Sequence, residues 1–169
     1  MSRPLRAIAA LAITGLLLAG CSTPPNTAAV VNGERITETE VADAWLALEP
    51  AVAEGVGPAI VLESLVQNAL LAPVAAEFGM TASAEDIANF ADNVYQGAAP
   101  DPFPEGLTNV LGFIILANQL NSSPLSAEIQ DAYLIAMQDA DIEVNPRFGT
   151  INEMGALNPP AFEWITSEQ

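Results

Sequence analysis

The fold of this chain is decided by the sequence AAVVNGERIT, residues 28–37. The apolar residues that open this stretch predict a short strand, and Asn32-Gly33 is a pair typical of a tight turn. Thr37, with Glu40 three positions later, predicts a capping box that begins a helix. A strand, a turn and a helix start are therefore expected one directly after another.

The spacing of apolar residues after this stretch predicts helices. The first runs from Thr37 toward Pro50, with Val41, Trp45 and Leu48 on one face. A longer second helix begins at Pro58, which suits the first turn of a helix, and is closed by Gly79. Pro73 lies inside this second helix, where its missing amide and its ring predict a kink or a break.

Three further helices are expected downstream. Ser83 is predicted to cap the third, whose buried face carries Ile87, Phe90, Ala91 and Val94. The prolines and glycines of residues 96–106 predict a loop, which leads to a fourth helix at roughly residues 107–120. The run FIIL at 113–116 makes this helix apolar nearly all round, which is typical of a central core helix or of a helix covered by a partner. Ser126 is expected to cap the fifth helix.

The segment after the fifth helix predicts a second strand, at residues 142–144, which Asn145-Pro146 ends. Two isolated short strands need each other to satisfy their backbones, so residues 28–31 are predicted to pair with this strand. From Arg147 to Gln169 the sequence predicts turns and a last short helix over residues 160–165. The predicted fold is therefore mostly helical, with a small two-stranded sheet that joins the N- and C-terminal segments.

The opening stretch resembles the start of the SurA-like N-terminal domain, whose pattern is A-x-V-N-G-x-x-I-[ST]. Further likeness to this family covers most of residues 28–137. The segments that carry it are LESLV (62–66), Leu70-Leu71, AEFGM (76–80), Ser83 with Glu85-Asp86-Ile87, and Ser126 to Ile129 with Ala132-Tyr133. Beyond them, EVNPRFG (143–149) resembles the tail of actinobacterial secreted members of the group. The resemblance implies a helical, peptide-binding chaperone domain.

Members of this family, which includes the SurA and PrsA foldases, often carry a parvulin-type prolyl isomerase domain as well. That domain takes roughly 90 residues, the size of an independent domain, and fewer follow Met137 here. The parvulin histidines are also missing, because the chain has no histidine. The resemblance therefore implies the chaperone part alone, and we expect no enzyme activity.

The N-terminal residues resemble the precursor of a bacterial lipoprotein. Arg3 and Arg6 precede an apolar run over residues 7–18, and Leu-Ala-Gly-Cys ends at Cys21. The likeness to the lipobox implies cleavage after residue 20 and lipid on Cys21, the one cysteine of the sequence. The expected organisation is a signal peptide at 1–20, a lipidated tether at 21–27 and a single domain at 28–169, held on the extracytoplasmic face of the cell membrane.

The charge of the chain excludes several classes of function. Without residues 1–20, two arginines remain against 21 acidic residues, a formal charge of −19, so nucleic acid and anionic lipid are not expected partners. The sequence has no histidine and no lysine, which excludes a Ser-His-Asp triad, histidine-ligated metal, a Ser-Lys dyad and a P-loop. Carboxylate chemistry stays open, but no pair of acids is singled out by spacing. No metal or cofactor is expected.

Large apolar side chains are the candidates for a peptide-binding groove. They are Trp45, Phe78, Met80, Phe103, Phe113 and Tyr133. Apolar residues at helical spacing more often belong to the core, and Phe103, in the proline-rich loop, is the strongest candidate for exposure.

A second group of residues is expected to shape the sheet and the segment that follows it. It consists of Asn32, Gly33, Asn145, Pro146, Arg147 and Gly149. Arg147 and Arg35 are each expected to make an internal ion pair or to cap helix carbonyls, with a partner's carboxylate as the functional alternative. Asp139, Asp141 and Glu143 have the spacing of part of a calcium loop, but the glycine and the distal glutamate of such a loop are missing, which favours a solvated strand edge.

These observations favour a non-catalytic function. The first hypothesis is chaperone-like binding of unfolded or secreted polypeptides at the membrane surface, through apolar contacts. The second is an adaptor subunit that uses a flat helical face to bind one membrane or envelope protein. A carboxylate hydrolase is a third, which no motif supports.

Overall fold

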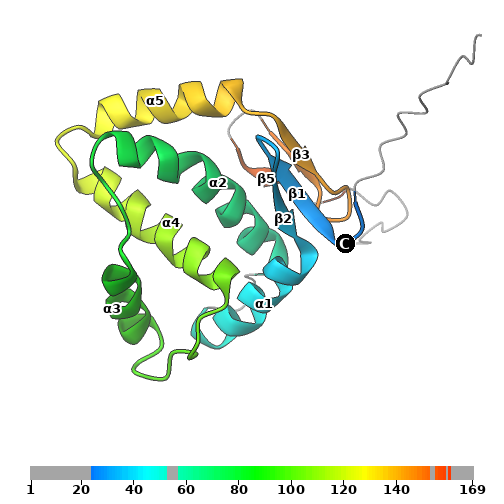
Figure 1. Ribbon diagram of the computed structural model, residues 1–169, viewed down its shortest axis with the longest axis vertical. Coiled ribbons are helices and arrows are strands. Elements are labelled where there is room, and N and C mark those ends of the chain that lie inside the picture. Colours follow the sequence, from blue (N-terminus) through cyan, green and yellow to red (C-terminus); the bar gives the residue numbers. More distant parts are fainter. Residues whose placement is uncertain (1–23, 53–56, 153–154, 159, 161–169) are drawn as a thin grey trace, which may run out of the picture.

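The computed structural model describes residues 24–52, 57–152, 155–158 and 160, and Figure 1 shows their arrangement. The elements in chain order are β1 (Thr27–Val31), β2 (Glu34–Thr37), α1 (Glu38–Leu48), the 3₁₀ turn η1 (Glu49–Ala51), α2 (Pro58–Glu77), α3 (Ala84–Val94), α4 (Glu105–Ser122), α5 (Ser126–Asp139), β3 (Ile142–Val144), β4 (Thr150–Ile151) and β5 (Leu157–Asn158). The predicted fold class, mostly helical with a small sheet between the two end segments, is confirmed. Residues 1–23, which include the expected signal peptide and Cys21, lie outside the described residues.

The first strand, β1, is the centre of a three-stranded antiparallel sheet with the order β2-β1-β3. The amide of Asn145 donates a hydrogen bond to the carbonyl of Ala28, and the amide of Asn32 donates to that of Asp141, each 2.8 Å long. The expected pairing of the first strand with the strand that follows the fifth helix is confirmed. Segments more than a hundred residues apart in sequence thus lie side by side (Figure 1).

The sheet has three strands where the sequence predicted two. Asn32 and Gly33 have φ angles of 51° and 84°, and two left-handed residues in succession make a type I′ turn. Such a turn returns the chain alongside the strand it has just left. Residues 34–37 therefore pair with β1 before α1 begins, instead of leading directly into the helix.

The core lies between the sheet and the helices, with α2 and α4 side by side at its centre (Figure 1). Leu62 of α2, Leu107 and Leu111 of α4 and Ile129 of α5 are completely buried. By length and composition α2 could cross a membrane, but the core helix of a folded domain passes the same test. Its inward face supplies buried residues along its whole length, so packing in the core accounts for its apolar character.

Most of the expected helix starts are present. The Thr37 hydroxyl accepts a hydrogen bond of 3.0 Å from the amide of Glu40, and Ser83 and Asp86 form a complete capping box at α3. The predicted cap at Ser126 is wrong, because Ser126 is already helical and the cap position before it is occupied by Leu125, which supplies no side-chain acceptor. The fourth helix begins at Glu105, two residues earlier than predicted.

A kink or a break was also predicted at Pro73, and there is no break, because the helix runs continuously from Pro58 to Glu77. Pro73 is exposed, and Pro73 and Ala69 both line an open hollow, so the hydrogen bond that Pro73 cannot donate to the Ala69 carbonyl is missing on the groove side of the helix and not in the core. The helix therefore tolerates the missing hydrogen bond.

The C-terminal part contains a hairpin that the sequence did not predict. It consists of β4 and β5, and these strands of two residues each pair in antiparallel fashion. Glu63 and Gln67 of α2 hold this hairpin, because Glu63 Oε2 accepts from the Leu157 amide (3.3 Å) and Gln67 Nε2 donates to the Gly155 carbonyl (3.4 Å). Residues 161–165 of the predicted last helix lie outside the described residues.

Candidate functional site

A groove runs along the helical layer where β2, α2 and α4 meet. Its central hollow has a volume of about 400 Å³ and is bounded by β2 on one side and by α2 and α4 on the other. A hollow of about 420 Å³ adjoins it at the starts of α1 and α4, and one of about 270 Å³ adjoins it between α2, α4 and the start of α3. Because neighbouring hollows share lining residues, they form one feature, the α2–α4 groove.

The two ends of the groove differ in chemistry. Carboxylates line the acidic end, namely Glu34, Glu40, Asp43 and Glu105. Apolar side chains line the apolar end, namely Met80, Ala82, Ile87 and Leu116. Asn68, Ala72 and Asn109 line both the central hollow and the apolar end, and so connect them. A ligand that fills the groove would therefore meet negative charge at one end, amides in the middle and apolar surface at the other end.

The half-buried carboxyl of Glu40 is the focus of the acidic end. Burial raises its pKa, and the charges of Glu105 and Glu34 raise it further. Two hydrogen bonds act against this increase and lower the pKa of Glu40. One comes from the Thr37 amide, and the other from Asn109, whose Nδ2 lies 3.5 Å from Glu40 Oε1. The net effect is a pKa above the ordinary value, as expected for a partly buried acid among other acids.

The one basic residue at this end is Arg35, on β2. Its side chain is exposed, and it makes no ion pair with any residue that the structure describes, so the internal pair expected for Arg35 is not found there. β2 is an outer strand of the sheet, paired with β1 on one side only. The acidic end therefore lies beside a sheet edge to which no described strand is added.

The six residues predicted to line a groove are not brought together in one place. Trp45, Phe103 and Tyr133 pack against the main core cluster, while Met80, Phe113 and again Tyr133 pack against a smaller cluster of Leu71, Ala75 and Leu116. Burial raises the pKa of Tyr133, with a smaller contribution from the charge of Glu63. Phe78 is half-buried just after α2, and Phe103 is half-buried as well.

Met80 alone among those six lines the α2–α4 groove. Sequence reasoning missed the other lining residues because it searched for large apolar side chains, whereas the walls consist largely of small and polar ones. The signal that could have pointed to the groove was the presence of Asn68 and Asn109, each directly beside an apolar residue, in the two central helices.

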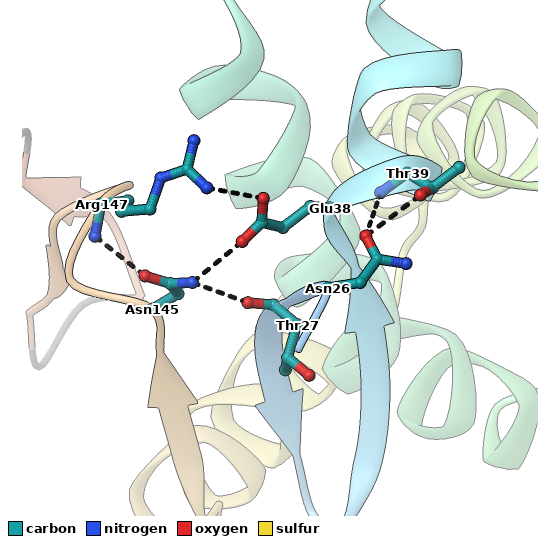
Figure 2. Close-up of polar contacts among 6 residues, drawn as sticks. All are labelled: Asn26, Thr27, Glu38, Thr39, Asn145 and Arg147. Atoms are coloured by element: carbon teal, nitrogen blue, oxygen red, sulfur yellow. Dashed lines mark hydrogen bonds and ion pairs between the residues drawn. The ribbon is translucent and has the colours of Figure 1, made fainter. Parts of the chain in front are cut away.

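Asn145 and Arg147, which were expected to shape the C-terminal segment, lie in a polar network that Figure 2 shows. Nδ2 of Asn145 donates to the Thr27 carbonyl (2.9 Å) and to Glu38 Oε1 (3.2 Å), and its Oδ1 accepts from the Arg147 amide (3.1 Å). Nη1 of Arg147 lies 2.8 Å from Glu38 Oε2. Arg147 thus makes the internal ion pair predicted for it, between the segment after β3 and the start of α1.

The other four residues of that group have backbone or turn roles. Asn32 Oδ1 accepts from the Asp141 amide (2.9 Å), and Gly33 completes the hairpin turn. Gly149 has a φ of 120° and donates to the Pro146 carbonyl, so it supplies a backbone conformation that other residues rarely adopt. These residues hold the sheet together and do not line the groove.

The described residues contain no group of three or more histidine, cysteine, aspartate or glutamate side chains placed to hold a metal ion. Asp141 and Glu143 are exposed at the β3 edge, and the Asp141 carbonyl accepts the hydrogen bond from the Asn32 amide. The α2–α4 groove is therefore the site on which a functional proposal can rest. No protein-family model, curated protein or solved structure matches the chain.

Proposed function

We propose that this chain is a non-catalytic, chaperone-like lipoprotein that binds extended or partly folded polypeptides on the extracytoplasmic face of the cell membrane. The observation that carries the proposal is the α2–α4 groove, which joins apolar surface, side-chain amides and charge in one open channel. A polypeptide carries apolar side chains, backbone amides and charged side chains along its length. A single segment could therefore contact the apolar end, the amides in the middle and the acidic end together.

The length of the groove suits a short extended segment. Glu105 and Leu116 line its opposite ends and belong to the same helix. At a rise of about 1.5 Å per residue, their positions on the helix axis are roughly 16 Å apart. An extended chain advances about 3.3 Å per residue, so about five residues would fill this distance.

The proposed lipid on Cys21 would place the groove close to the membrane. Six residues, 21–26, separate the start of the proposed anchor from β1. Fully extended, they span at most about 20 Å. The domain would therefore meet polypeptides at the membrane surface, where secreted chains emerge.

The test is suppression of aggregation of an unfolded, acidic client at low and at high salt. Binding through apolar contacts is expected to persist in salt, because screening weakens charge pairs and leaves hydrophobic burial intact. Gly112 lies in the wall of the apolar end, so Gly112→Leu should fill that end and reduce suppression, whereas Ala127→Leu, on the exposed face of α5, should not. No suppression at either salt concentration would rule out the chaperone function. Suppression of basic clients alone, lost in salt, would mean that the charge of the chain, not the groove, binds them.

A second candidate is the adaptor subunit, and the outer face of α5 favours it. Leu134 and Ile135 are 48% and 60% exposed there, and Leu125 just before the helix is 44% exposed. An adaptor would co-purify from solubilised membranes with one stoichiometric partner, and Ile135→Glu would release that partner while Gly112→Leu would not. The opposite pattern would favour the groove.

A further inference from the structure

We propose that the α2–α4 groove binds a polypeptide as a strand added to the edge of β2, with a lysine or arginine side chain of that polypeptide in the acidic end. This inference rests on the proposed polypeptide-binding function, and it names the mode of binding and the side chain that is selected. Three features of the groove carry it: the backbone groups of β2, the excess of carboxylates over the single cation Arg35 around the central hollow, and the Ala69 carbonyl that Pro73 leaves without a helical donor.

The backbone of β2 offers a free donor and acceptor at Arg35. In an antiparallel ladder, hydrogen-bonded and non-bonded pairs alternate along a strand. The bonds from Asn32 to Asp141 and from Asn145 to Ala28 show that Val30 bonds toward β3. Val30 is also opposite Arg35, so the amide and the carbonyl of Arg35 point away from β1, toward the open edge. These are the two groups that an added strand would pair with.

The side chains around this edge select the charge of the added strand. Glu34, Glu40 and Glu105 face the central hollow, and Arg35 is the sole cation there. An ammonium or guanidinium group placed among them would neutralise the repulsion between Glu40 and its two acidic neighbours. A second copy of this chain is a poor occupant, because the molecule carries a formal charge of −17 and two copies repel each other.

The opposite wall of the central hollow has an acceptor of its own. Pro73 has no amide to donate to the carbonyl of Ala69, and both residues line the hollow. That carbonyl lacks its usual helical donor, and an amide or an ammonium group of the ligand would supply one. The ligand would then be held by β2 on one side and by α2 on the other.

The order of chemistry along the groove gives the ligand a pattern. The basic side chain occupies the acidic end, and apolar side chains occupy the apolar end about 16 Å away along α4. A strand advances about 3.3 Å per residue and alternate side chains point the same way, so an apolar residue four positions from the basic one is the nearest match to this separation. A suitable probe is the labelled, end-blocked peptide Ser-Lys-Ser-Ser-Ser-Leu, together with its reversed sequence, because either strand direction can pair with an edge.

The first experiment measures binding of this peptide to the full chain in detergent by fluorescence anisotropy. Replacing the lysine by norleucine, which keeps the four-carbon stem and removes the ammonium group, should weaken binding by roughly tenfold. Glu40→Gln and Glu105→Gln should each weaken binding of the lysine peptide several-fold and have little effect on the norleucine peptide. Glu128→Gln, an exposed acid on α5, is the matched control and should leave both affinities unchanged. Equal loss for the two peptides, or no loss, would overturn the assignment of the acidic end.

The second experiment keeps the protein unaltered and methylates the peptide amides one at a time. Strand addition predicts that the loss of affinity alternates along the peptide, because alternate amides face β2. Arg35→Pro, which removes the outward amide as well as the arginine side chain, should bind the peptide more weakly than Arg35→Ala, which removes the side chain alone. A uniform effect of methylation, or pairing of two copies of the chain without peptide, would overturn the strand-addition mode. If no peptide binds while aggregation of the acidic client is still suppressed, this inference fails and the proposed function stands; if neither occurs, both fail.

Discussion

At the scale of single residues, Asn145 does more for the fold than the ion pair beside it. Its side chain donates hydrogen bonds to the Thr27 carbonyl and to Glu38 of α1, and accepts one from the Arg147 amide. The guanidinium of Arg147 reaches the same glutamate, but its side chain is 73% exposed. An exposed ion pair contributes little, whereas buried or half-buried groups that lose their partners cost much more.

We therefore expect Asn145→Ala to lower the free energy of unfolding by about 1–3 kcal/mol, and Arg147→Ala by about 0.2–1 kcal/mol. Urea denaturation of the two variants and of the unaltered chain measures the difference. Equal losses would show that the network is centred on the ion pair and not on the amide.

Glu40 provides a prediction about pH. Its folded pKa is raised, chiefly by burial, so folding favours its neutral form. The stability that this preference contributes is present below the ordinary pKa of about 4.3 and is lost as the pH rises through the folded value. Glu40→Gln, which is neutral at every pH, should be more stable than the unaltered chain at pH 7, by at most about 0.5 kcal/mol because solvent screens a partly exposed group.

Asp86 gives the opposite control. Hydrogen bonds from the Ser83 hydroxyl and the Ser83 amide lower its pKa, so its contribution is present above the ordinary value and is lost as the pH falls. Asp86→Asn should therefore be less stable than the unaltered chain at pH 7 and approach it in acid. Thermal unfolding of both variants at about pH 3.5 and at pH 7 tests the signs, and a destabilised Glu40→Gln at neutral pH would refute the account of Glu40.

At the scale of elements, α1 and α4 meet at a glycine. A Cβ atom on Gly106 would lie 2.8 Å from the Glu40 carbonyl oxygen and 3.0 Å from the Ala44 Cβ. A backbone carbonyl cannot move aside as the end of a flexible side chain can. The close contact of the two helices therefore requires a residue without a side chain at this position.

Gly106→Ala is expected to lower the free energy of unfolding by about 1–3 kcal/mol, because the helices must separate to admit the methyl group. Gly112 of the same helix is the matched control, since the nearest atoms to its added Cβ lie 3.9 Å away. Gly112→Ala should raise stability by up to about 1 kcal/mol through helix propensity alone. Calorimetry measures both changes in stability. If Gly106→Ala and Gly112→Ala changed the free energy of unfolding in the same direction, this account of the contact would be wrong.

The elements that could be predicted are those whose signals are local. The apolar spacing of α2 and the capping box at Ser83 lie within their own segments, and the sequence located both. β2 was missed because it has only four residues, between the turn at Asn32-Gly33 and the helix cap at Thr37. The turn and the cap were both predicted correctly, and they left too few residues for a strand pattern to stand out. β4 and β5 have two residues each, too few to form a pattern.

The groove could not be predicted for a different reason. Glu40, Asn68 and Glu105 belong to three helices, and no spacing in the sequence shows that they face one hollow. The large side chains that the sequence did single out, such as Trp45 and Phe113, are mostly used in packing, as their size and helical spacing favour.

At the scale of the whole molecule, the proposed anchor can be tested apart from the groove. We expect Cys21→Ala to release the protein from the membrane fraction or to block its processing, because Leu-Ala-Gly-Cys resembles a lipobox that needs the thiol. Intact mass and cell fractionation report both outcomes. A variant that is still processed and still membrane-bound would show that another segment holds it there.

The place of β1 at the centre of the sheet has a consequence for when the molecule can fold. Its two neighbours are synthesised far apart in time, because β2 follows at once and β3 ends at residue 144. At about 5–20 residues per second, translation leaves roughly ten seconds in which the Val30 side of β1 has no partner. During that interval one open edge is β1 itself, the strand that is later central in the sheet, so the growing chain can pair there with other chains until β3 has been made.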